Sequence, residues 1–106
     1  MATSSPVQEL LDELDRMANR ADRAEKFSAA SVYRESQDML RDYASQPYGG
    51  SILGYGMNLF SDFAQEDSGR ADDERKAFEE VRDTVALVAD VRGIKLDADP
   101  ESPTLF

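Results

Sequence analysis

The chain has no histidine, no cysteine and no tryptophan among its 106 residues. It therefore lacks the commonest general base, the thiol nucleophile, and the usual ligands of zinc and haem. The absence of cysteine also agrees with an intracellular protein. These gaps favour a protein that binds a partner over an enzyme, and we expect neither a cofactor nor a metal ion.

Long hydrophobic runs are missing as well. The longest is Val85–Ala89, whereas a membrane-spanning helix needs about 20 apolar residues. Residues 1–7 have neither the basic nor the apolar region of a secretory signal. We therefore expect a soluble, cytoplasmic protein without a membrane partner, acting in the host cytoplasm if it is encoded by a phage.

Acidic residues dominate the charge. The chain carries 22 aspartates and glutamates against 12 lysines and arginines, a net charge of −10. Residues 51–106 hold thirteen of the acids and six of the bases, so the excess is concentrated in the second half. This charge argues against direct binding of nucleic acid and predicts a protein partner with a basic surface.

The first half of the chain has the hydrophobic periodicity of two helices, at about 6–24 and 28–45. Ser5 and Pro6 suit the start of the first helix. A turn near residues 25–28 would join the two into an antiparallel hairpin. One long helix through residue 45 is the alternative, because neither glycine nor proline enforces a break. The first stripe keeps an a/d spacing over Val7, Leu10, Leu14, Met17, Ala21 and Ala24.

Residues 21–40 resemble the helical hairpin of tetratricopeptide repeats and of microtubule-interacting-and-transport domains. Those families place small residues where the helices approach, an aromatic that closes the turn, and a tyrosine on the second helix. The turn glycine that often precedes the aromatic is Glu25 here. The resemblance implies a hairpin that presents a groove to a partner. The matching residues are Ala21, Phe27, Ala30 and Tyr33.

The middle of the chain is rich in glycine. Residues 47–50 end the second helix, and Gly54 and Gly56 follow, so we expect a Gly-rich loop before a short helix at about 57–65. These glycines do not predict a phosphate-binding loop, because no Lys-Ser/Thr follows them. The apolar segment Ile52–Phe63 either completes the core or forms an exposed binding patch, and the core is favoured.

A last helix is expected at about 72–92, with acids in its first turn and Gly93 as its stop. The predicted fold is all-α: a small three- to four-helix bundle with an N-terminal antiparallel hairpin and a Gly-rich central loop. Residues 1–96 form the single domain, and 97–106 a loosely ordered, flexible acidic tail. The expected core contains Leu10, Leu14, Met17, Val32, Leu40, Val81, Val85 and Val88.

The acids of the second half are candidate partner-binding residues. Carboxylates on successive helical turns can approximate the charge spacing of a phosphate backbone, and so occupy a nucleic-acid-binding cleft. In composition the chain resembles small acidic phage-encoded inhibitors of host defence or DNA-processing proteins. The alternative is a merely solubilising surface. The candidates are Glu66, Asp67, Asp72, Asp73, Glu79, Glu80 and Asp83.

The C-terminal residues Leu105 and Phe106 are a second candidate. A Leu-Phe pair at the end of an acidic tail resembles the peptides that dock into the bacterial sliding clamp, although Ser102 replaces their leading glutamine. Both side chains suit a hydrophobic pocket on a partner.

From these observations we expect a non-enzymatic protein-binding module. It would be a bacterial or phage accessory protein that modulates or inhibits a basic, nucleic-acid-handling partner, and a DNA mimic is one form of such an inhibitor. The alternative is a self-assembling structural or scaffold component of a virion, a homo-oligomer built through the heptads of the first helix.

Overall fold

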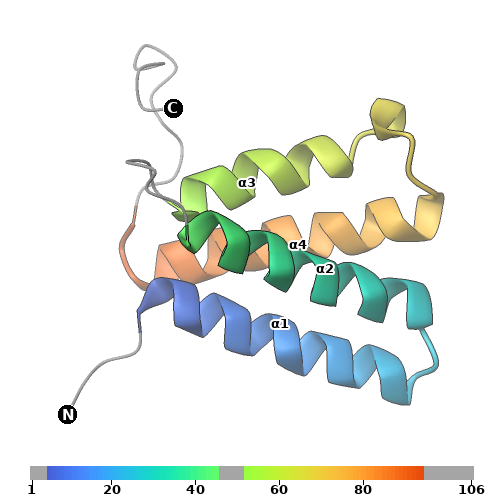
Figure 1. Ribbon diagram of the computed structural model, residues 1–106, viewed down its shortest axis with the longest axis horizontal. Coiled ribbons are helices and arrows are strands. Elements are labelled where there is room, and N and C mark those ends of the chain that lie inside the picture. The colour runs from blue at the N-terminus through green and yellow to red at the C-terminus, as the bar shows by residue number, and fades with distance from the viewer. Residues whose placement is uncertain (1–4, 46–51, 95–106) are drawn as a thin grey trace.

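The computed structural model describes residues 5–45 and 52–94, and within them the protein is an all-α bundle (Figure 1). The helices run as two antiparallel pairs, α1 with α2 and α3 with α4, and α4 packs against the other three. Their bounds are α1 Pro6–Arg23, α2 Phe27–Ala44, α3 Ile52–Phe63 and α4 Asp72–Val91, with a 3₁₀ turn η1 at Glu66–Ser68.

The start of α1 follows from its first residues. Ser5 Oγ accepts a hydrogen bond from the backbone N–H of Gln8 at 3.0 Å, which satisfies one of the free donors of the first turn. Pro6 fits the first helical position because that position needs no N–H donor. Leu10 and Leu14 are fully buried, so the heptad stripe of α1 lies within the bundle.

The helical hairpin of the first half is present, and Glu25 makes the turn. Glu25 has a φ of 61°, the left-handed conformation that usually belongs to glycine. The N–H of Lys26 donates to the carbonyl of Ala21 at 2.8 Å, and that of Glu25 to Asp22 at 3.0 Å. These bonds end α1 in a Schellman motif without a glycine. The single long helix through residue 45 is therefore excluded.

The end of α4 has the same Schellman motif, here with the glycine that usually occupies the left-handed position. Gly93 has a φ of 71°, and the N–H of Ile94 donates to Ala89 at 2.8 Å. Two equivalent turns, one with glutamate and one with glycine, thus occur in one chain.

Replacing Glu25 with glycine is expected to stabilise the protein by about 1 kcal/mol, because a left-handed L-residue costs roughly that much. The matched change Gly93→Ala should destabilise it by a similar amount. Urea unfolding of both variants measures the two effects. Equal stability of Glu25→Gly and the parent would show that the turn carries no strain.

The second helix is tied to the first by polar contacts as well as by apolar packing. Asp22 forms an ion pair with Arg34, and this bond lowers the pKa of the Asp22 carboxyl. Gln37 is buried, and its Nε2 donates to the carbonyl oxygen of Leu11 at 2.9 Å. Phe27, by contrast, is 65% exposed, so it does not close the turn as the resemblance implied.

The prediction for the central helix was wrong at its start. The expected bounds were 57–65, but α3 begins at Ile52 and includes Gly54 and Gly56. The helix tolerates these poor helix formers because it is packed into the bundle, mainly against α4 and also against α2. A Cβ at Gly56 would lie only 3.3 Å from Leu40 Cδ2 and 3.2 Å from Phe60 Cε2. The other predicted loop glycines, within 47–50, lie outside the described residues.

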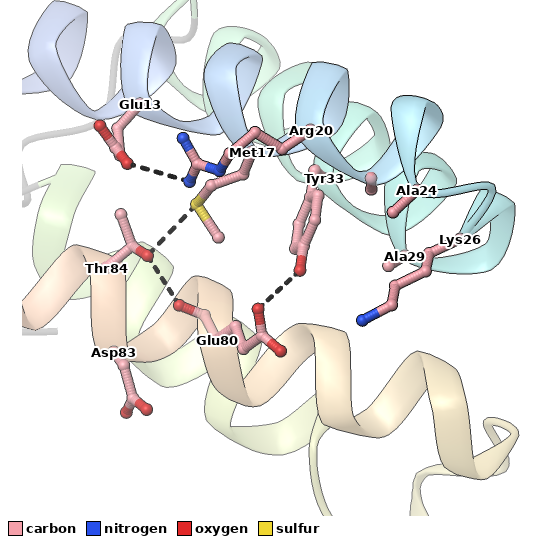
Figure 2. Close-up of a pocket in the computed structure, with 11 residues that line it drawn as sticks. Glu13, Met17, Arg20, Ala24, Lys26, Ala29, Tyr33, Glu80, Asp83 and Thr84 are labelled. Carbon is pink, nitrogen blue, oxygen red and sulfur yellow. Dashed lines mark hydrogen bonds and ion pairs between the residues drawn. The ribbon is translucent and has the colours of Figure 1, made fainter.

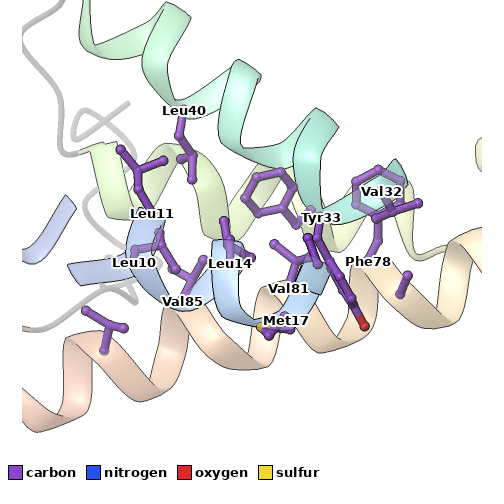
Figure 3. Packing of buried hydrophobic residues seen from close by; sticks show 14 of the residues in the cluster. Leu10, Leu11, Leu14, Met17, Val32, Tyr33, Leu40, Phe78, Val81 and Val85 are labelled. Carbon is purple, nitrogen blue, oxygen red and sulfur yellow. The ribbon is translucent and has the colours of Figure 1, made fainter. Parts of the chain in front are cut away.

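The core joins residues from all four helices (Figure 3). Phe60 of α3 and Phe78 of α4 are fully buried, with their rings stacked at 6.1 Å between centroids. The apolar segment of α3 therefore completes the core rather than forming an exposed patch. All eight expected core residues are buried: Leu10, Leu14, Met17, Val32, Leu40, Val81, Val85 and Val88.

Candidate functional site

The predicted acids of α4 form two lines along its surface. Asp72, Glu79 and Asp83 recur at seven- and four-residue spacing, so they follow one line on the helix, and all three are exposed. Asp73 and Glu80, also exposed, are seven residues apart on a neighbouring line. Three acids begin the helix, where they are favoured by its dipole. The structure thus brings these five predicted residues onto one helix.

One acid of this surface was missed from the sequence. Asp90 is exposed and lies seven residues after Asp83, so it extends the first line. The heptad spacing was the signal that could have identified it. We call the surface formed by Asp72, Asp73, Glu79, Glu80, Asp83 and Asp90 the acidic face.

Glu66 and Asp67 lie outside α4, in η1, and both are exposed. Their position is held by Arg70, two residues after η1. The Arg70 guanidinium lies 4.4 Å from the ring centre of Phe63, and its Nη2 contacts Glu35 at 3.1 Å. Stacking and an ion pair therefore fix the α3–α4 connection against the bundle. This places the two η1 acids next to the start of α4.

The acids differ in how far internal contacts use them. Asp72 is paired with Arg75, and Asp83 lies 3.3 Å from Arg82 Nη2. Lys76, an exposed cation, lies between Asp72 and Glu79 along the helix. Of the seven candidate acids and Asp90, six form no ion pair within the described residues and so keep their charge for a partner: Glu66, Asp67, Asp73, Glu79, Glu80 and Asp90.

Glu80 has a contact of another kind. Its Oε1 accepts a hydrogen bond of 2.7 Å from the hydroxyl of Tyr33, a buried residue of α2. Burial raises the pKa of Tyr33, and the hydrogen bond and negative charge of Glu80 raise it further. The bond orients the Glu80 carboxylate and leaves its second oxygen without a hydrogen-bond donor among the described residues.

The raised pKa predicts a loss of stability at alkaline pH. The folded state keeps the Tyr33 proton while the unfolded chain loses it above its ordinary value of 10.0. This contribution is therefore complete below pH 10 and declines as the pH rises, by at most about 1.4 kcal/mol per pH unit. Tyr33→Phe should lose less stability between pH 10 and 11 in urea unfolding. Identical alkaline profiles would contradict this.

A pocket lies beside Glu80, between α1, α2 and α4 (Figure 2). Its volume is about 530 Å³, within the range of ligand-binding clefts. Met17, Ala21 and Tyr33 are its buried members, whereas Arg20 and Lys26 are exposed at its edge. Neither Tyr33 nor Lys26 was predicted as a site residue, because the pocket joins segments far apart in the sequence.

Other kinds of site are not supported by the described residues. No three metal-ligating side chains gather anywhere in residues 5–45 or 52–94. No helix in that part of the chain is both long enough and apolar enough to cross a membrane. The candidates Leu105 and Phe106, with the acidic tail, lie outside the described residues.

Comparison with known proteins adds no relative. No protein-family model matches the chain, and neither a curated protein nor a solved structure is significantly similar to it. The function is therefore inferred from the geometry and charge of the acidic face and the pocket.

Proposed function

We propose that this chain is a non-enzymatic protein-binding module that docks its acidic face on a basic surface of a nucleic-acid-handling partner. In this proposal it is a bacterial or phage accessory protein that inhibits or modulates the partner. It acts in the cytoplasm, that of the host if a phage encodes it.

The observation that carries the proposal is the density of exposed carboxylates on α4. From Asp72 to Asp90 the helix rises about 27 Å, and six carboxylates of the acidic face lie along that length. This is about one charge per 5 Å, against one per 3.4 Å on a single DNA strand. Lys76 interrupts the face, and Arg75 and Arg82 pair with two of its acids, but the six carboxylates still outnumber these three cations.

The position of the acids also favours binding over catalysis. Acid–base catalysis by a carboxylate pair needs a substrate held in hydrogen-bond reach of both groups. Asp72 and Asp83 have side chains that are 83% and 71% exposed on the outside of α4. A convex, solvated row of charges suits contact with a protein surface instead.

The alternative of assembly through α1 has less support. The a/d residues Leu10 and Leu14 are fully buried, and Met17 is 8% exposed. Because the stripe is already used within the bundle, a homo-oligomer built on it would require the bundle to open.

Parallel affinity captures test the proposal. The parent and a variant with Glu66, Asp67, Asp73 and Glu79 changed to lysine are immobilised, and bound proteins are identified by mass spectrometry. We expect the parent, but not the variant, to retain a basic protein at low salt. Added duplex DNA should elute that protein from the parent. Equal retention of the same proteins by both chains would contradict the proposal.

A further inference from the structure

We propose that the pocket between α1, α2 and α4 receives a lysine or arginine side chain of the partner, with Glu80 as its anchor. This inference rests on the proposed function, because it names the part of the acidic face that binds a side chain of the basic partner. It adds a specific pocket to a face that would otherwise act by general charge.

The shape of the pocket suits a long side chain with a charged end. Met17, Ala21 and Tyr33 are buried at its base, whereas Glu80 and Asp83 are exposed on its α4 side. The base offers apolar contact to the methylene stem of a lysine or arginine, and the edge offers charge to its head. Small side chains leave room for the pocket near the end of α1, just after it and in the first turn of α2: Ala21, Ala24 and Ala29.

Among the three carboxylates that line the pocket, Glu80 is the one free to bind a cation. Glu13 is already held by Arg16 at 2.6 Å and lies 3.6 Å from Arg20. Asp83 is paired with Arg82 and points away from the pocket in Figure 2. Glu80 has no ion pair in the described part of the chain, and the Tyr33 hydroxyl holds it in place. An oriented carboxylate binds a cation at a smaller entropic cost.

The charge of the pocket as a whole also has to be considered. Lys26 and Arg20 would oppose a cation, but both are exposed, and Arg20 already lies beside Glu13. The net charge of −10 on the chain makes the surroundings unfavourable for an anionic ligand. We therefore infer a cationic ligand, whose binding Lys26 weakens without preventing.

The test is a titration of the isotope-labelled protein with acetylated, amidated tetra-arginine, followed by amide chemical shifts. The expected perturbations centre on Ala21, Tyr33 and Thr84. Glu80→Gln keeps an acceptor for Tyr33 but removes the charge, and it should weaken binding about tenfold, the loss of one charge-assisted hydrogen bond. Glu79→Gln, the matched change on the outside of α4, should weaken it by less than about twofold, as an exposed charge does.

Two further variants test the pocket without altering its carboxylates. Ala24→Phe should block the pocket and weaken binding, while Lys26→Gln should strengthen it. Thermal unfolding of each variant confirms that the bundle is intact.

The possible failures are distinguishable. If Glu79→Gln and Glu80→Gln weaken binding equally and the perturbations spread along α4, the proposal for the pocket is contradicted. The proposal that the acidic face binds a basic partner then still stands. If tetra-arginine at low salt perturbs no amide of the described helices, both the pocket and the proposed function are overturned.

Discussion

Replacing Leu14 with alanine is expected to lower the free energy of unfolding by about 2–5 kcal/mol, the usual cost of emptying a buried leucine site. Leu14 is fully buried among side chains of the core (Figure 3). The loss is a large fraction of the roughly 5–15 kcal/mol that stabilises a typical domain. Urea unfolding followed by circular dichroism gives the value.

Leu87→Ala is the matched control, because it removes the same atoms from a leucine that is 60% exposed. We expect it to change stability by less than about 0.5 kcal/mol. A similarly small effect at Leu14 would mean that the stripe of α1 is not part of the core.

Reversing four acids is expected to slow association with the partner by about 10- to 1000-fold at low salt, the range of electrostatic steering. The variant carries lysine at Glu66, Asp67, Asp73 and Glu79. None of the four forms an ion pair within the described residues, so folding stability should fall mainly through Asp73, whose place in the first turn of α4 contributes about 0.3–1 kcal/mol. The expected difference in association rate between the parent and the variant decreases as the salt concentration rises, because exposed charges are screened over about 8 Å at physiological ionic strength. Stopped-flow mixing with the captured partner measures the rates.

A control with the same net charge separates local from general effects. Four exposed acids of the hairpin, when changed to lysine, also reduce the net charge from −10 to −2, because each reversal adds two charges. We expect this control to associate faster than the reversed variant. Equal rates for the two would assign the effect to net charge and not to the acids of η1 and the acidic face. The control residues are Asp12, Asp15, Asp38 and Asp42.

The fold could be predicted largely from local pattern. Leu10, Leu14 and Met17 recur at helical spacing, and Gly93 follows the last apolar turn of α4 with the left-handed conformation expected of it. The prediction was wrong at the start of α3, where tertiary packing outweighed the low helix propensity of glycine. Gly54 and Gly56 suggested a loop, but a helix forms there, and both glycines are buried within the bundle, where a Cβ at Gly56 would lie 3.3 Å from Leu40 Cδ2.

The turn at Glu25 shows a second limit of local pattern. Nothing in its type favours a positive φ, and the conformation follows from the packing of α1 on α2. The sequence therefore left two interpretations open, a hairpin and one long helix.

The candidate site also could be predicted only in part. The acids of α4 lie within one short stretch of the sequence, so their shared helix could be predicted, and Asp90 followed the same spacing. The contact of Tyr33 with Glu80 joins residues 47 positions apart. It depends on how α2 meets α4, which no local pattern contains. The pocket was missed for that reason.

Competition between duplex DNA and this chain for the captured partner tests the proposed docking most directly. If the acidic face occupies a nucleic-acid-binding surface, the apparent Kd of the chain for its partner rises linearly with the concentration of free DNA. An unchanged Kd at DNA concentrations that saturate the partner would contradict the proposal, as would a partner that binds no DNA.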